Sequence, residues 1–268
     1  MAKKQQKLEP INKPIVDGSC KGKDTRSLIL KRMLSVLIIG IVYFACSMML
    51  FFDVLWAEIL VCVGLTGLIF YHQYVTGMGL GERDCALGEI LYERQEKGGT
   101  VSKEDQEHSF HPWKGFVATT VGLIPFLIPC LILAFTAQKV VYSLGVLPSW
   151  VSSATQQTNI SDALSYYNNL SGASFLDILR ILVRAMLMPY FTVATSIGSE
   201  TALWAERFSG LLLILGPLGY GFGYRQGRRA RGMVNASIKA GVDKKKRRER
   251  KEKRQRQMRR AQGPGQLN

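Results

Sequence analysis

The carboxyl-terminal part of the chain carries the residues best suited to binding chemistry. Residues 225–260 hold 17 of the 35 lysines and arginines but only three acids, Asp243, Glu249 and Glu252. Basic clusters beside a membrane span bind anionic headgroups, at about 1 kcal/mol per base near the surface, and they bind nucleic-acid phosphates without sequence preference. The sequence therefore predicts anionic lipid or phosphate binding by nine bases of this tail: Lys244, Lys245, Lys246, Arg247, Arg248, Arg250, Lys251, Lys253 and Arg254.

The partner of this tail is left open between two classes by the sequence. The plainer interpretation is an orientation signal and a solvated helix that contacts anionic lipid. The alternative is an acidic partner such as the ribosome or RNA. No aromatic residue follows Tyr224, so the tail has no platform on which single-stranded bases could stack.

A second candidate is an acid inside an apolar run. Glu58 is the one acid clearly within such a run, and three arginines, Arg180, Arg184 and Arg207, lie in the segment expected on the opposite side from the tail. Charges inside a membrane are costly and face a partner or a water-filled path. We expect Glu58 to form a structural ion pair with Arg184 or Arg207. The alternative is a proton or ion pathway, for which these runs hold few polar residues.

Two histidines are the only weak candidates for a metal site. His108 and His111 are three residues apart and could share a helical face, but a third soft ligand is missing from the surrounding sequence. The five cysteines are scattered singly, which favours neither a disulfide framework nor zinc. The sequence therefore predicts no bound metal, no cofactor and no catalytic residues, and hence a protein that is not an enzyme.

Long apolar runs define the fold class. Residues 33–52 and 115–137 are free of charge over 20 and 23 residues, and about 20 apolar residues cross a bilayer core. Residues 54–71 and 203–224 are further expected spans. Residues 175–198 carry Asp177, Arg180 and Arg184 on one helical face and apolar residues on the other, the pattern of an interfacial helix, and Pro189 should bend this segment.

Charge counting decides between four and five spans. With four spans, 31 of the 35 bases face the cytoplasm, whereas a fifth crossing by residues 175–198 would divide them about evenly. Cytoplasmic loops carry the excess of bases, so we expect four spans with both termini in the cytoplasm. The predicted fold is all-α, with four transmembrane helices, an outer interfacial amphipathic helix and a basic cytoplasmic tail.

These expectations divide the chain into seven segments. They are a disordered basic N-terminal tail (1–24), a transmembrane hairpin (25–75), a cytoplasmic acidic helical loop (76–114), a third span (115–137), an outer loop with the interfacial helix (138–202), a fourth span (203–224) and the basic cytoplasmic tail (225–268). Asp53 marks the turn of the hairpin. Within the acidic loop, Gly98 and Gly99 should end one helix, and Ser102 with Asp105 resembles the cap of another.

Glycines mark two further positions. Gly77, Gly79 and Gly81 follow an apolar helix rather than a strand, which argues against a nucleotide-binding loop and favours a flexible exit from the bilayer. Gly219 and Gly223 are spaced to let two helices approach closely, and we favour packing within the chain over packing against a second copy.

Two short motifs resemble sequences in known proteins. They are the stretch Phe110-His-Pro-Trp-Lys-Gly115 and the exit Gly219-Tyr-Gly-Phe-Gly-Tyr224. With the basic tail and the closing residues 263–268, they resemble a group of uncharacterised multi-pass membrane proteins of Gram-positive anaerobic bacteria. The resemblance implies a bacterial cytoplasmic membrane and carries no known activity.

The sequence thus predicts a multi-pass protein of the cell membrane with a non-enzymatic role. Its polybasic tail is expected to bind anionic lipid, or an acidic partner such as the ribosome. The alternative is a small transporter, or an accessory subunit of another membrane protein, that uses Glu58 and the outer-side arginines.

Overall fold

Helices dominate the chain because its apolar runs are long and its prolines are few. The computed structural model describes residues 9–50, 52, 54–137 and 175–261. Of these described residues 84% are helical and none lies in a strand, so the expected all-α class is confirmed for this part of the chain. Residues 138–174 of the expected outer loop, and Asp53 at the expected hairpin turn, lie outside the described residues.

Among the described residues, three helices are long and apolar enough to cross a membrane: α1 (Lys23–Met49), α2 (Leu55–Glu96) and α4 (Lys114–Thr136). A fourth candidate exists only if α7 (Phe175–Met186) and α8 (Met188–Ile197) count together as one span. These two helices meet at an angle of 101°, and Pro189 lies at the start of α8. The expected bend at this proline is therefore present.

The helix expected over residues 203–224 is divided in two. Helix α9 (Ser199–Arg207) ends before Phe208, and α10 begins at Ser209 and continues without a break to Ala261. The division turns Glu206 toward partners on α7. The apolar part of α10 up to Tyr224 is shorter than the roughly 20 residues that a full crossing needs, and α10 is not among the spanning candidates found in the described residues.

The chain forms two compact units, and α1, α2, α4 and α10 each contribute to both. Unit 1 comprises Met1–Ile29, Tyr71–Thr119 and Leu218–Asn268, and unit 2 comprises Leu30–Phe70 and Thr120–Pro217. Unit 2 has an apolar core formed by residues from α1, α4, α7, α8 and α10 and from the junction of α7 and α8: Val36, Leu123, Cys130, Leu133, Val183, Leu187, Phe191 and Leu213.

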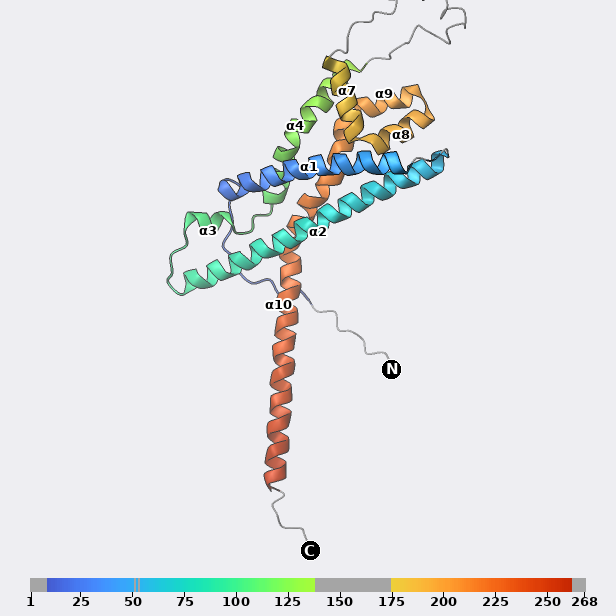
Figure 1. The fold of residues 1–268 in the computed structure, drawn as a ribbon. Coiled ribbons are helices and arrows are strands. Elements are labelled where there is room, and N and C mark those ends of the chain that lie inside the picture. The colour runs from blue at the N-terminus through green and yellow to red at the C-terminus, as the bar shows by residue number, and fades with distance from the viewer. Residues whose placement is uncertain (1–8, 51, 53, 138–174, 262–268) are drawn as a thin grey trace, which may run out of the picture. The chain divides into compact units, whose positions relative to one another are not determined.

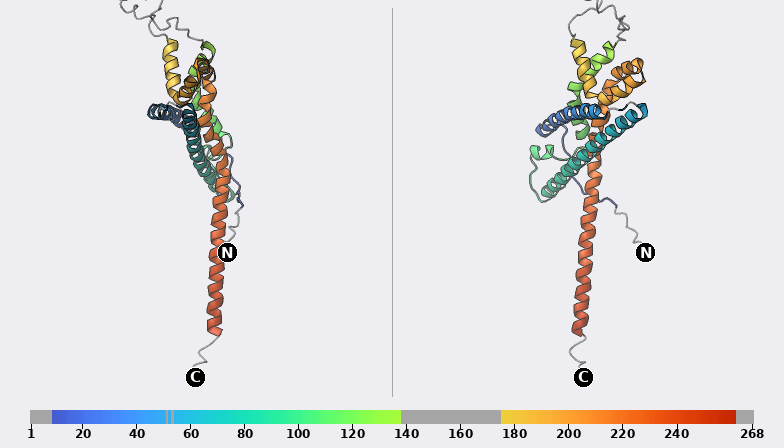
Figure 2. Two further views of the ribbon diagram at one scale, coloured as in Figure 1. Left: turned by 90° about the vertical axis from the view of Figure 1, so that its right-hand side faces the viewer. Right: turned by 45° about the vertical axis from the view of Figure 1, so that its right-hand side comes forward.

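In unit 1, α2 and α10 pack backbone against backbone (Figures 1 and 2). A Cβ atom at Gly77 or Gly81 would collide with the carbonyl oxygens of Tyr220 or Tyr224, and one at Gly223 would collide with that of Tyr74. The expected close approach at Gly223 is thus confirmed as packing within the chain. The flexible exit expected at residues 77–81 is wrong, because these residues belong to an uninterrupted helix whose glycines allow the crossing.

The acidic loop follows the expected local signals. Helix α2 ends at Glu96, Gly98 has a φ angle of +79°, and the N–H of Gly99 donates to the carbonyl of Arg94 at 2.9 Å. This is the bond pattern of a glycine C-cap. The hydroxyl of Ser102 accepts from the N–H of Asp105 and caps the short helix α3 (Lys103–Glu107).

The described part of the N-terminal segment, which starts at residue 9, differs from the disordered tail expected over residues 1–24. From Ile11 to Gly18 its backbone is bonded to other parts of unit 1, at Gly232, Gly88 and Phe110. The side chain of Gln106 also donates to the carbonyl of Asp17. The low hydrophobicity of this segment suggested disorder, but these backbone bonds hold it along α2 and α10.

Candidate functional site

The predicted binding tail is the last part of α10. From Ser237 to Met258 every side chain is exposed, including the nine predicted binding bases. In Figures 1 and 2 this part of α10 continues as one straight helix, clear of the other elements of unit 1. The bases therefore do not form a separate element; they extend a helix that begins in unit 2.

The spacing of charges explains why such a basic segment is helical. Asp243, Glu249 and Glu252 each have a base four residues before and four residues after in the sequence. Opposite charges at this spacing stabilise an isolated helix by about 0.2–0.5 kcal/mol per pair. The three acids are thus placed where each offsets repulsion between the surrounding bases.

A buried carboxylate fixes α10 just before it becomes exposed. Glu89 of α2 accepts two hydrogen bonds from Arg231, at 2.9 and 3.0 Å, and one from the side-chain amide of Asn235, at 2.6 Å. That amide also donates to the carbonyl of Ile11. The base of the exposed helix is therefore tied to α2 and to the N-terminal segment.

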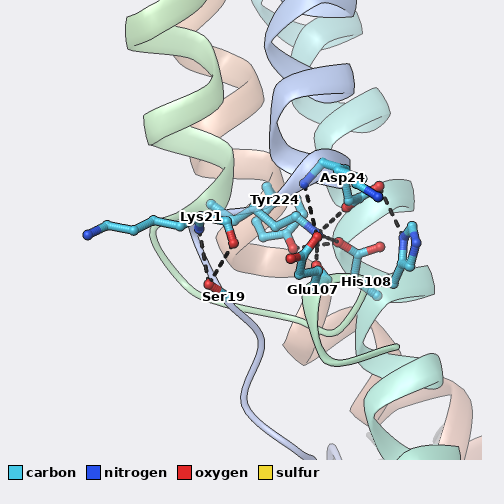
Figure 3. Close-up of polar contacts among 9 residues, drawn as sticks. Ser19, Lys21, Asp24, Glu107, His108 and Tyr224 are labelled. Atoms are coloured by element: carbon cyan, nitrogen blue, oxygen red, sulfur yellow. Dashed lines mark hydrogen bonds and ion pairs between the residues drawn. The ribbon is translucent and has the colours of Figure 1, made fainter. Parts of the chain in front are cut away.

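A buried lysine holds a second polar cluster in unit 1 (Figure 3). The ammonium group of Lys114 lies 2.6 Å from Asp24 and 3.2 Å from Asp84, and it donates to the carbonyl of Glu107 at 2.9 Å. The hydroxyl of Tyr224 donates to the same Asp84 oxygen at 2.6 Å. The cluster joins the first turns of α1 and α4 to α2 and α10.

Burial and charge oppose one another at Asp84, which lies beyond the apolar part of α2. Burial raises the pKa of its carboxyl group, while the Lys114 ammonium and the Tyr224 hydroxyl act to lower it. Each of the two acids has a donor, since Lys114 lies beside both Asp24 and Asp84 and the Tyr224 hydroxyl donates to Asp84. We interpret this cluster as a structural anchor for the helix ends rather than as a site of chemistry.

Sequence reasoning missed this cluster, although two of its members lie in the two motifs. Lys114 belongs to the stretch 110–115 and Tyr224 to the exit 219–224, and the two meet at Asp84. The rings of Phe110 and Tyr224 also stack, with centroids 5.3 Å apart. The sequence did hold one signal of this cluster: a charged residue, Lys114, stands in a motif rich in aromatic residues at the start of an apolar helix.

The arginines of α7 have a partner other than the expected Glu58. Arg184 donates twice to Glu206, at 2.5 and 2.9 Å, and Arg180 lies 3.2 Å from the same oxygen. The Glu206 side chain is only 1% exposed. Arg207 instead lies over the ring of Trp204, 5.2 Å from its centroid. The expected ion pair of Glu58 is therefore wrong, because the break at Phe208 places Glu206 closer to the arginines of α7.

Glu58 is satisfied by a neutral group. It is buried, and its carboxylate accepts from the hydroxyl of Ser196 on α8 at 2.6 Å. Beside it is a cavity of about 10 Å³, lined in part by Ser47, Cys62 and Thr192. Such a volume holds about one water molecule, so the site has no room for a larger solute.

The two histidines do not come together as ligands. His108 lies 3.1 Å from Asp24, whereas the Nδ1 atom of His111 accepts from the N–H of Trp113 and lies 2.8 Å from the thiol of Cys20. Among the described residues no group of three metal-ligating side chains is suitably placed. Burial raises the pKa of the Cys20 thiol, and the charge of Lys114 partly opposes this.

Comparisons with protein-family models, curated proteins and solved structures find no match to this chain. The apolar helices suggest a membrane protein, and the charged end of α10 is exposed from Ser237 to Met258.

Proposed function

We propose that this chain is a non-enzymatic, multi-pass protein of a bacterial cytoplasmic membrane whose polybasic helix engages an anionic partner. In this proposal α1, α2 and α4 cross the bilayer, residues 203–224 of α9 and α10 together make the fourth crossing, and both termini are cytoplasmic. The partner is anionic lipid or an acidic macromolecule such as the ribosome. The spanning helices anchor the polybasic end of α10 to the membrane.

One observation carries this proposal: a fully exposed helix of concentrated positive charge continues from an apolar helical bundle. Every described side chain from Ser237 to Met258 is accessible to a partner. The charged groups of Lys114, Glu89 and Glu206 are buried, by contrast, and are not accessible to a partner. The charge on α10 therefore supports a binding role better than the buried groups support catalysis.

The test compares the full-length protein with a variant in which residues 244–260 are replaced by a neutral helix of the same length. Both are held in discs of zwitterionic lipid and mixed separately with anionic vesicles and with ribosomes. We expect the intact protein to sediment with at least one of these partners and the neutral-helix variant to lose most of that binding. Equal sedimentation of the two proteins with both partners would refute the proposal.

The membrane arrangement has its own test. Reporter domains fused to residues 1 and 268 should both be active in the cytoplasm, because the bases of the tail resist translocation. A reporter inserted near residue 155 should be active on the other side. Termini on opposite sides would contradict the four-span arrangement and would leave residues 175–198 as a crossing segment.

Transport is a second candidate because Glu58 is a buried acid beside a cavity. The cavity accommodates about one water molecule. It could therefore serve the passage of a proton through a hydrated Glu58 carboxylate, but it has no room for a larger solute. A Glu58→Gln variant in proteoliposomes should then lose proton flux while remaining folded. If the proton flux is unchanged in this variant, Glu58 has a structural role and the transport hypothesis fails.

A further inference from the structure

We propose that the partner of α10 is the phosphate backbone of a nucleic-acid duplex rather than the lipid of the membrane that holds the protein. This inference rests on the proposed function, since it identifies the anionic partner of the same helix. The segment concerned is Lys244–Arg256, here called the basic block, which contains ten bases and two acids.

The basic block has no face that could enter a lipid interface. Residues 243–257 include no apolar residue, whereas interfacial helices bury an apolar face among the acyl chains. Lys244 to Arg248 are five consecutive bases, and a helical turn contains 3.6 residues. All faces of the helix therefore carry positive charge, so an anionic partner can bind to any of them.

The unbroken helix also holds the basic block away from its own membrane. Lys244 lies 20 residues beyond Tyr224, where the apolar part of α10 ends, and this is about 30 Å along the axis. Membrane helices tilt by up to about 40°, which still leaves a height of roughly 23 Å. The Debye length is about 8 Å at physiological salt, so headgroup attraction is largely screened at the basic block.

The charge density of the basic block matches that of a duplex. Its net charge of +8 is spread over about 18 Å of helix, or one charge in about 2.3 Å. Duplex DNA carries one negative charge in about 1.7 Å of axis. Protein surfaces mix acids with bases, so few present an equal density of negative charge. A single strand is a poorer candidate, because α10 has no aromatic residue beyond Tyr224 on which bases could stack.

The helix is already formed before it binds. Its acids lie at the spacing that stabilises an isolated helix, and Glu89 fixes its base through Arg231 and Asn235. Ordering a flexible side chain or loop costs affinity on binding, and this cost is reduced for a preformed helix. The duplex would be recognised by its backbone and not by its sequence.

The experiment measures binding of the full-length protein, held in zwitterionic lipid discs, to fluorescent RNA and DNA duplexes of one sequence. We expect binding to at least one duplex, and the tighter of the two identifies the source of the phosphate. If half of the ten bases contact phosphates, affinity for DNA should fall about 500-fold between 50 and 200 mM salt. Polyglutamate should displace the fluorescent duplex at least tenfold more weakly than unlabelled duplex at the same charge concentration.

A helix-breaking variant tests the distance argument. Gly241 lies in α10 where an added Cβ would meet nothing, so Gly241→Ala keeps the helix intact and Gly241→Pro breaks it. In zwitterionic discs the two variants should bind a duplex within about twofold of each other. In discs containing anionic lipid, Gly241→Pro should bind at least fivefold more weakly than Gly241→Ala, because its released basic block can now reach the headgroups.

The outcomes separate this inference from the proposed function. Absence of duplex binding in zwitterionic discs, or equal competition by polyglutamate, would overturn the inference. So would equal effects of anionic lipid on the two Gly241 variants. If anionic vesicles still retained the intact protein but not the neutral-helix variant, the proposed function would stand with lipid as partner. Loss of every charge-dependent interaction would overturn both.

Discussion

The ammonium group of Lys114 lies 3.2 Å from the carboxylate of Asp84, and the two side chains are 0% and 8% exposed. Asp24, 2.6 Å from the same nitrogen, supplies a second negative charge. This arrangement joins the beginnings of two apolar helices to the α2–α10 pair, and it determines how unit 1 should respond to substitution.

Replacing Lys114 by Met should strongly destabilise unit 1. The substitution keeps most of the volume but leaves two acids without their cation, and breaking a buried ion pair costs about 3–5 kcal/mol. Thermal unfolding in detergent is the measurement. The control is Lys103→Met, at an exposed position, which should change stability by less than about 0.5 kcal/mol. Equal shifts for the two variants would show that the buried pair has no special role.

The glycines of α2 should separate into two classes. Alanine at Gly77 or Gly81 forces α2 and α10 apart, since the added Cβ collides with backbone carbonyls of α10. Both variants should therefore lower the midpoint of thermal unfolding. Gly79 has nothing within 4 Å of an added Cβ, so Gly79→Ala should leave the midpoint unchanged or raise it, because alanine favours a helix by about 0.5–1 kcal/mol. A flexible exit from the bilayer would instead make all three variants behave alike.

Glu58 and Ser196 should be energetically coupled. A hydrogen bond to a charged group contributes about 1.5–3 kcal/mol, and this one lies in a buried environment. A double-mutant cycle with Glu58→Ala and Ser196→Ala should return a coupling energy in that range. Glu58→Gln, which keeps an acceptor for the hydroxyl, should cost less than Glu58→Ala. Additive effects of the two alanines would mean that the contact is absent or has no consequence for stability.

The thiol of Cys20 should react slowly in the folded protein. Its pKa is raised by burial, and the thiolate is the reactive form. In a variant with Cys20 as its single cysteine, the alkylation rate should keep rising with pH where the rate of the unfolded control has levelled off. Since the unfolded thiol loses its proton first, raising the pH through this interval also favours unfolding. Identical pH profiles for folded and unfolded protein would contradict the burial of this thiol.

Local features of the fold were predictable because their causes are local. The all-α class follows from the length of the apolar runs, the end of α2 from Gly98, and the cap of α3 from Ser102 and Asp105. The bend between α7 and α8 follows from Pro189. The exposed basic helix was visible in its charge. Each of these signals lies within a few residues of the structure that it determines.

The partners of the buried charges were not predictable. By residue type alone Arg184 could have met Glu58 or Glu206, and the break at Phe208 placed Glu206 beside it. The N-terminal segment is held by backbone bonds to residues about 70 to 220 positions away, which no local pattern encodes. The glycines of α2 and α10 likewise acquire their role only where the two helices cross.

The amino-acid sequence by itself determined the helical class of this chain, its apolar segments and the concentration of positive charge near its end. Those properties depend on residue type and spacing along one segment. The tertiary structure alone decided that Lys114, Asp84 and Tyr224 meet, and that the basic block continues α10 as one unbroken helix fixed at Glu89. Contacts between distant segments depend on how whole helices pack, and that packing arises from many weak interactions acting together.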